Sequence, residues 1–121
     1  MARRDVPTCT LAERLGDVRE RALSSGWGAC VVVNDTSVVL GILRRRELDA
    51  DPDSTVEAAM RPGPSTFRPY VSIKEMAAFM TDHDLADAPI TTSDGRLVGL
   101  LVREDAKQAA EELASRKRDA G

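Results

Sequence analysis

The sequence predicts an α+β fold built from two tandem strand-helix-strand-strand-helix units, and three observations predict it. An apolar run, a polar turn and an apolar-Gly-apolar run occur in residues 27–45 and again in residues 85–103. Gly41 aligns with Gly99, so the period is 99 − 41 = 58 residues and two copies fill the 121-residue chain. In each copy, a hydroxyl residue with Glu three positions later precedes an apolar helical pattern. The predicted units are residues 1–60 and residues 61–121.

The first helix of each unit is predicted from its start and from its apolar face. Thr10-Leu11-Ala12-Glu13 and Ser72-Ile73-Lys74-Glu75 fit the capping box, in which hydroxyl and carboxylate satisfy free backbone donors. Apolar residues recur at helical spacing behind both starts: Leu11, Leu15, Val18 and Ala22, and Ile73, Met76, Ala77 and Met80. Both segments are therefore predicted to be amphipathic helices.

A β-hairpin and a second helix are predicted to follow each of these helices. The strand pairs are residues 29–33 with 38–43 and residues 88–91 with 97–101, each joined by a polar turn. The tip Ser93-Asp94-Gly95 supplies residues that a tight turn favours. The second helices are expected to start near Arg45 and Arg103.

The segment that joins the two units is expected to be irregular and then extended. Pro52 interrupts the first unit's second helix, and Ser54-Thr55-Val56-Glu57 offers a capping box for a short helix to Met60. Residues 61–69 contain three prolines, which lack the backbone donor that a helix needs. A short extended piece, Ser65 to Phe67, is expected because it lies 58 residues after Pro7 to Cys9.

Composition excludes several classes of protein. Hydrophobic residues make up 42% and charged residues 31% of the chain, which is typical of a globular domain. No apolar run approaches the roughly 20 residues of a membrane span, and no apolar stretch follows the basic N-terminus, so we expect a cytoplasmic protein without a membrane partner. Acidic residues directly follow Arg44-Arg45-Arg46 and the net charge is −3, so a nucleic-acid partner is not expected. With two cysteines and one histidine, no metal site is expected.

Taken together, the elements resemble the tandem cystathionine beta-synthase (CBS) domain pair, also called a Bateman module. The resemblance covers nearly the whole chain. It rests on the two repeated units, on Ala88-Pro89-Ile90, and on the turn, strand and helix start from Ser93 to Asp105. It implies two units related by a pseudo-twofold axis, with their sheets packed together and helices outside. It also implies two clefts between the units that bind adenosine-containing ligands.

The same resemblance implies which residues bind the ligand. In the family, a Ser or Thr after the last strand contacts phosphate, and an Asp three residues later binds the ribose hydroxyls. These positions are Val102 and Asp105 in the second unit, and Arg44 and Glu47 in the first. Ala88, Pro89 and Thr66 match positions whose backbone frames the adenine, although strand-edge packing and turn chemistry explain them equally well.

Only Asp105 keeps the family's residue type at these four positions. A carboxylate suits the ribose because it accepts two vicinal hydroxyl donors. Val102 offers phosphate no donor, so Arg103, Arg44 or the neighbouring Arg45 and Arg46 would have to supply it with their bidentate guanidinium groups. The alternative interpretation is that these arginines are solvated residues at helix starts. The Asp105 cleft is the preferred site.

Three functional hypotheses follow. The first is a stand-alone regulatory module, not an enzyme and without a required cofactor, that binds AMP, ADP, ATP or S-adenosylmethionine and signals to a separate protein. The second is a dimeric interaction or adaptor module whose clefts have lost ligand binding, which the departures at Val102 and Glu47 favour. The third is a thiol switch through Cys9 and Cys30, although a Cys in an apolar strand is more often a small core residue. A homodimer through the helices at 11–23 and 73–80 is expected because Phe79 widens an apolar stripe.

Overall fold

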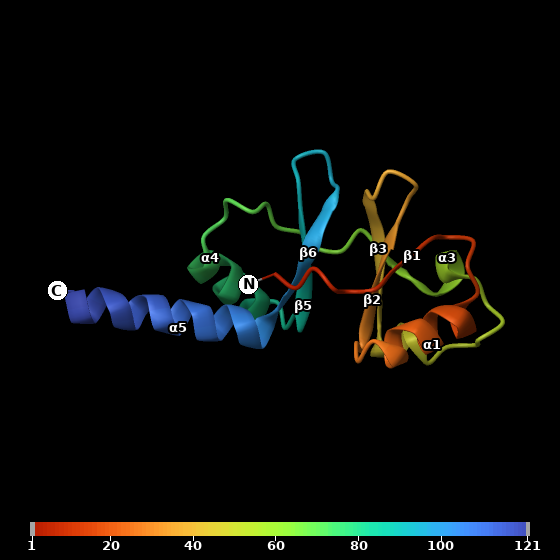
Figure 1. The fold of residues 1–121 in the computed structure, drawn as a ribbon, viewed down its shortest axis with the longest axis horizontal. Helices are drawn as coiled ribbons and strands as arrows, with labels where there is room; N and C mark the ends of the chain where they lie inside the picture. The colour runs from red at the N-terminus through yellow and green to blue at the C-terminus, as the bar shows by residue number, and fades with distance from the viewer. Residues whose placement is uncertain (1, 121) are drawn as a thin grey trace.

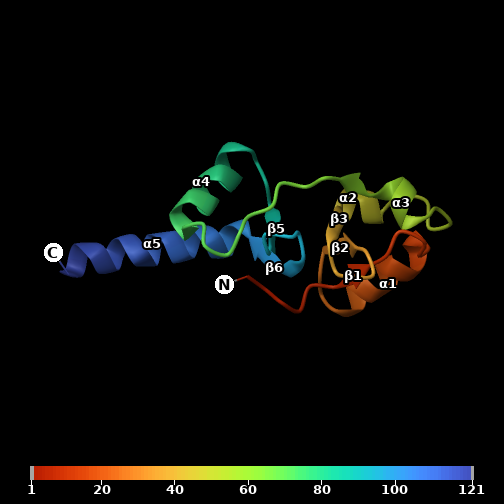
Figure 2. The same ribbon diagram turned by 90° about the horizontal axis from the view of Figure 1, so that it is seen from above.

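The computed structural model describes residues 2–120, with side chains for residues 2–116. It is an α+β structure in which two similar halves lie next to each other along the long axis (Figures 1 and 2). The first half contains β1 (Thr8–Cys9), α1 (Leu15–Ser24), β2 (Ala29–Val33), β3 (Val39–Arg44), α2 (Arg45–Leu48) and α3 (Val56–Ala59). The remaining elements are β4 (Arg61–Pro62), α4 (Ile73–Asp82), β5 (Asp87–Thr91), β6 (Leu97–Val102) and α5 (Arg103–Ala120).

Each half has a central antiparallel hairpin flanked by one edge segment on either side. In the first half the order is β1-β2-β3-β4, with β1 parallel to β2 and β4 antiparallel to β3. In the second half β5 pairs with β6, Phe67 bridges Ile90 in parallel, and Arg3 bridges Leu100 antiparallel. The outer segment on β6 therefore comes from the start of the chain, whereas β4 on β3 lies just after the first unit. Figure 1 shows the N-terminal segment crossing from one half to the other.

The tips of the two hairpins meet at equivalent residues. Val38 bridges Arg96, and these positions are 96 − 38 = 58 residues apart. The Val39 amide donates to the Gly95 carbonyl at 3.0 Å, and the Leu97 amide donates to the Ser37 carbonyl at 2.9 Å. The two hydrogen bonds are equivalent, because Leu97 is the counterpart of Val39 and Ser37 is the counterpart of Gly95 in the other repeat. The predicted pseudo-twofold axis therefore passes between the hairpin tips.

Three apolar clusters form the core of the protein. One lies inside each half, between a sheet and its helices. The third is shared, because Val31 and Ile42 of the first half pack with Leu100 of the second. Each of these three side chains is fully buried. Burial of about 25 cal/mol per Å² of apolar surface makes such clusters the main stabilising contribution.

The predicted helices are present, but two of them begin at later residues than the sequence predicts. Ser72 caps α4 as predicted, since its hydroxyl accepts from the Glu75 amide at 3.2 Å. Helix α1 begins at Leu15 rather than after Thr10, because the amides of Leu15 and Gly16 donate to the carbonyls of residues 54 and 52. Thr10 and Glu13 still pair with each other, but in a turn before the helix. The hydroxyl that caps α3 belongs to Thr55, not to Ser54.

Two glycines at equivalent positions let the edge segments cross the hairpins closely. A Cβ on Gly41 would lie 2.8 Å from the Arg61 carbonyl oxygen, and a Cβ on Gly99 would lie 2.9 Å from that of Arg3. Real Cβ atoms do not approach backbone oxygens so closely, so a larger residue would push the edge segment away. The apolar-Gly-apolar pattern is thus the signature of this crossing.

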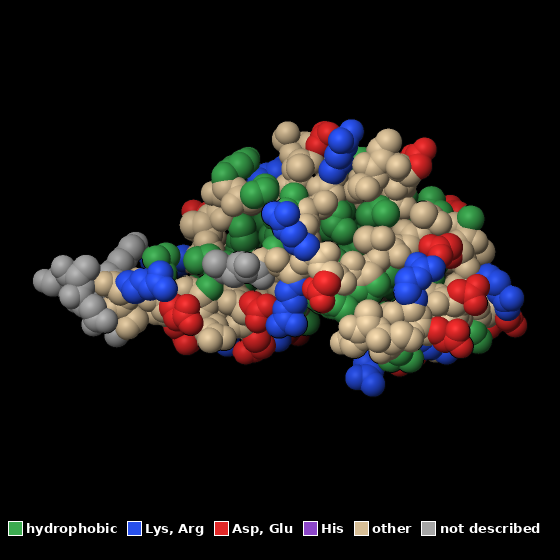
Figure 3. Space-filling view, viewed as in Figure 1, with side chains coloured by type: hydrophobic (Ala, Val, Ile, Leu, Met, Phe, Trp, Pro, Cys, Tyr) green, Lys and Arg blue, Asp and Glu red, His purple; other side chains and the backbone are tan. Residues whose placement is uncertain are grey.

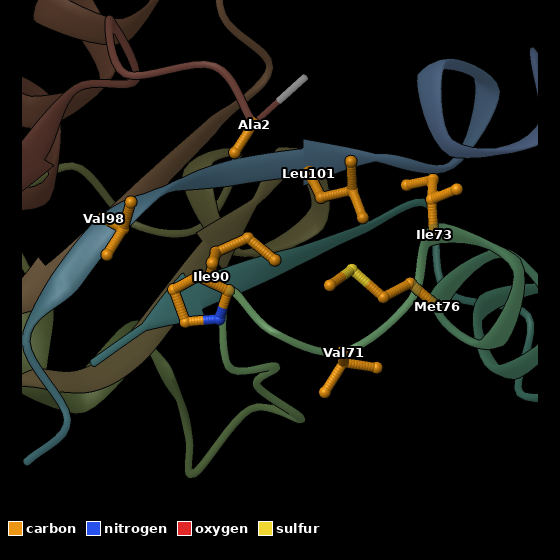
Figure 4. Close-up of a pocket in the computed structure, with 8 residues that line it drawn as sticks. Ala2, Val71, Ile73, Met76, Ile90, Val98 and Leu101 are labelled. Atoms are coloured by element: carbon orange, nitrogen blue, oxygen red, sulfur yellow. The ribbon is translucent and has the colours of Figure 1, made fainter. Parts of the chain in front are cut away.

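An apolar pocket of about 290 Å³ opens in the second half, between β6, α4 and the segment that contains Ala2. Figure 4 shows Ala2 at one wall, Val98 and Leu101 on β6, and Ile73 and Met76 on α4. The counterpart of Ala2 in the first half is Met60, 58 residues later, which packs against the first-half core. A methyl group replaces a long side chain, so the space stays open. In Figure 3, hydrophobic side chains reach the surface between α4 and β6.

We expect the exchange Ala2→Met to raise the free energy of unfolding by about 1 kcal/mol, because the longer side chain fills this pocket. Met60→Ala should lower it by about 2 kcal/mol by opening a cavity at the equivalent place. Urea unfolding measures both, and Ala2→Gln, of similar length but polar, is the control. A neutral or destabilising Ala2→Met would contradict the equivalence of the two positions.

Candidate functional site

The residues singled out from the sequence lie where the hairpins end and the second helices begin. Arg44 and Val102 are the last residues of β3 and β6. Glu47 and Asp105 lie in the first turns of α2 and α5. The 58-residue period relates each pair, so the fold contains two equivalent positions.

At the second position, Arg3 holds the carboxylate of Asp105. Its Nε donates to Oδ2 at 2.9 Å and its Nη2 donates to Oδ1 at 3.1 Å, so both carboxylate oxygens are engaged. These hydrogen bonds lower the pKa of Asp105. The Asp105 side chain remains 29% exposed and the Arg3 side chain 52% exposed. Asp105 is thus ionised and reachable from solvent at neutral pH.

The backbone and one aromatic ring fix Arg3 in this place. The Arg3 amide donates to the Leu100 carbonyl, and the Leu100 amide donates to the Arg3 carbonyl, both at 2.9 Å. The guanidinium carbon lies 5.8 Å from the centre of the Trp27 ring, within range of a cation–π interaction. Sequence reasoning did not single out Arg3 or Trp27. The available signal was the period, which makes Arg3 the counterpart of Arg61 beside β3.

At the first position, the two candidate residues are engaged differently. The Arg44 Nε donates to Asp87 Oδ1 at 2.9 Å and its Nη2 donates to the Asp87 carbonyl at 3.2 Å, which joins the two repeats. The Glu47 carboxylate is buried and accepts from the Arg44 amide at 3.1 Å, so it caps α2. Asp87 was not singled out from the sequence. The equivalent pair at the second position is Ala29 and Val102, which has no charge.

The other sequence candidates lie around the start of β5. Ala88 and Pro89 are buried within the hairpin, opposite Leu101 and Leu100. Thr66 is half-buried and precedes Phe67, whose amide donates to the Pro89 carbonyl at 3.0 Å. Since Arg44 binds Asp87, the neighbouring Ala88 and Pro89 belong with the first position. The contacts of Asp105 are with Arg3 instead.

The arginines expected to bind phosphate are divided between paired and exposed groups. Arg103 Nη1 pairs with Asp84 Oδ1 at 3.1 Å, and Arg44 pairs with Asp87. Arg45 is exposed and lines a hollow of about 370 Å³ together with Trp27 and Arg19. Arg19 is engaged there by the carbonyls of residues 48 and 50. Arg45 lines this hollow and, among the described residues, makes no ion pair with a carboxylate.

The cysteines and the histidine have structural surroundings. Cys9 and Cys30 are buried free thiols, and a hydrogen bond with Cys30 together with burial raises the pKa of the Cys9 thiol. His83 stacks on Phe79 at 3.9 Å between ring centroids, and Phe79 meets Phe67 edge to face at 5.4 Å. Phe79, expected at an interface, thus packs against residues of its own chain. A protonated, buried thiol is a poor nucleophile, which weakens the thiol-switch hypothesis.

Neither a metal site nor a membrane-spanning helix is found in the part of the chain that the structure describes. No cluster of three or more His, Cys, Asp or Glu side chains lies close enough to hold a metal ion. Among the helices within residues 2–120, none is long and apolar enough to cross a membrane.

Comparison with known proteins identifies relatives of this architecture. The profile of the CBS domain family matches residues 51–112. An uncharacterized protein of Methanopyrus kandleri is 26% identical over 116 residues, which cover 89% of this chain and 59% of that protein. The chain thus spans about three fifths of this relative.

Solved structures of other proteins share the fold. The structure of CBSX2 in complex with AMP has a TM-score of 0.82 at 17% identity and covers 94% of this chain and 93% of its own. The cytosolic domain of the Mg²⁺ channel MgtE in complex with ATP has a TM-score of 0.81 at 23% identity and covers 88% of this chain and 45% of its own.

The surroundings of the cysteines predict slow thiol chemistry. We expect the native protein to react with a disulfide reagent such as DTNB far more slowly than the protein in guanidinium chloride, in which both thiols are exposed. Because the pKa of Cys9 is raised, the rate at which Cys9 reacts with DTNB in the native protein should not rise with the titration of an ordinary thiol at pH ~8.5. Fast labelling of the native protein, with a rise through that pH, would restore the thiol switch.

Proposed function

The chain belongs to the CBS domain family, and on that premise we propose that it is a regulatory module that binds an adenosine-containing ligand between its two repeats. The chemistry of Asp105 supports this proposal most directly. Its ionised carboxylate lies in the first turn of α5, partly open to solvent, and can accept both vicinal hydroxyls of a ribose. The solved structures of CBSX2 with AMP and of the MgtE domain with ATP contain ligands of this class.

The proposed ligand is an adenine nucleotide or S-adenosylmethionine, bound reversibly and not as a required cofactor. Val102 offers no donor to a phosphate, so basic side chains near Asp105 must supply one. Arg3 is the nearest such group, since it already contacts the carboxylate. The first position is less suited to a ribose, because the Glu47 carboxylate is buried and caps its own helix.

A second candidate function is an interaction module without a ligand. The observation that favours it is that the acidic side chains at both positions already have internal partners, Arg3 for Asp105 and the Arg44 amide for Glu47. Under this alternative the ion pairs stabilise the contact between the repeats. The two functions differ in whether Asp105 exchanges its partner for a ligand.

Signalling requires a partner, and we propose a second copy of the chain together with a regulated protein in trans. Leu23 on α1 is 66% exposed and Leu113 on α5 is 42% exposed. Helix α5 extends beyond the body of the second half (Figure 1). We propose that the outer helices that carry these side chains pack against a second copy, since twofold dimers are the commonest assembly.

A thermal-unfolding screen tests ligand binding. With AMP, ADP, ATP or S-adenosylmethionine at about 100 times its Kd, we expect a stabilisation of about 2.7 kcal/mol, which is a rise of several degrees in Tm. Asp105→Ala should abolish the rise. Glu104→Ala, which removes an exposed carboxylate from the same helical turn, should retain it. If millimolar ligand leaves Tm unchanged, the interaction module becomes the better explanation.

The dimer is tested by light scattering after gel filtration. We expect twice the chain mass of 13.1 kDa at micromolar concentration. Leu113→Glu should shift the population toward monomer, because a charge would be buried at the interface. Tyr70→Glu replaces an exposed side chain in the loop before α4 and serves as control. A monomeric native protein, or equal effects of both changes, would count against an interface on α5.

A further inference from the structure

The Arg3 side chain makes the hydrogen bonds with Asp105 that the ribose of a ligand would need. A vicinal diol bound to Asp105 would donate to the same two carboxylate oxygens that now accept from Arg3 Nε and Nη2. Arg3 uses one lone pair on each carboxylate oxygen, in the bidentate geometry that a guanidinium fork and a vicinal diol both prefer. Ligand and Arg3 therefore compete for Asp105.

The contact is held by the fold and not by the side chains alone. The reciprocal backbone hydrogen bonds between Arg3 and Leu100 fix the Arg3 backbone, from which the guanidinium side chain extends, beside β6. Gly99 leaves room for this approach, since a Cβ there would lie 2.9 Å from the Arg3 carbonyl oxygen. Because the backbone stays paired, Arg3 can leave the carboxylate without leaving the site.

The other repeat lacks the same arrangement. Arg61, the counterpart of Arg3, lies on β4 and is the antiparallel partner of Ile42 on β3. Its side chain is exposed and makes none of the ion pairs found among the described residues. The Glu47 carboxylate accepts from the Arg44 amide instead. The internal competitor is thus a property of the Asp105 position alone.

We propose that Arg3 is an internal competitor that makes the Asp105 site select phosphorylated nucleosides. This inference rests on the proposed function and deepens it. When a ribose displaces the guanidinium from Asp105, Arg3 loses its anionic partner but remains nearby. A phosphate on the ligand replaces that partner with a bidentate ion pair. A neutral nucleoside offers no replacement, and the sulfonium of S-adenosylmethionine adds a like charge.

The same displacement gives a signal that does not depend on enzyme activity. Arg3 lies 5.8 Å from the Trp27 ring centre, and Trp27 is the only tryptophan in the sequence. When the guanidinium moves from Asp105 to a phosphate, the charge beside this ring changes. Trp27 fluorescence therefore reports directly on whether Arg3 changes partner.

The test compares AMP and adenosine binding by calorimetry in the native protein, Arg3→Gln and Arg61→Gln. The native protein should bind AMP more tightly than adenosine. Arg3→Gln removes both the competitor and the phosphate partner, so the ratio of the two affinities should fall by about tenfold. Adenosine alone should bind about two- to fivefold more tightly. Arg61→Gln is the matched control and should leave both affinities unchanged. AMP should change Trp27 emission in the native protein but much less in Arg3→Gln.

The outcomes separate this inference from the proposed function. If the native protein binds AMP and Arg3→Gln leaves the affinity ratio unchanged, the competitor is wrong and the regulatory function stands. If only Arg3→Gln binds AMP or adenosine, Arg3 is a competitor as proposed, and ligand sensing by the native protein is wrong. If neither protein binds either compound, both proposals fail. Arg3 is half exposed, so Arg3→Gln is expected to fold, which circular dichroism checks.

Discussion

The structure depends on the pairing of the two repeats through equivalent residues at their hairpin tips. Val38 faces Arg96, and two hydrogen bonds related by the 58-residue period connect the flanking backbone atoms. Behind the tips, Ile42 and its counterpart Leu100 lie in the shared cluster. Backbone pairing at this axis fixes how the repeats are oriented, and apolar burial there supplies the stabilisation. Every contact between the repeats described above follows from this orientation.

The edge segments extend the same symmetry to the proposed ligand positions. Gly41 and Gly99 allow a neighbouring chain segment to lie directly against each hairpin. In the second half that segment contains Arg3, which brings a cation to Asp105 across 102 residues of sequence. A symmetric scaffold thus holds two positions whose side chains differ. At one the repeats are joined by Arg44 and Asp87, and at the other the carboxylate is held by the start of the chain.

This difference explains how one fold can support unequal sites. An ion pair that is 28% and 13% exposed, as Arg44 and Asp87 are, is shielded from water and resists exchange of partners. The pair formed by Arg3 and Asp105 is more open, and exposed ion pairs contribute little to stability. The stable pair suits a structural contact between repeats. The weaker pair suits the proposed site, where a ligand would replace Arg3 at Asp105.

The sequence by itself determined the repeat, the order of elements and the family. The period of apolar and turn residues predicted strand bounds within a residue or two, because local side-chain patterns decide which face is buried. It also identified Ser72 as a helix cap and Asp105 as the matching carboxylate. Only the tertiary structure decided that α1 begins at Leu15, because the competing backbone acceptors come from residues 52 and 54. It alone also brought Arg3 to Asp105 and Asp87 to Arg44, since a contact between distant residues depends on how the repeats pack and not on any local pattern.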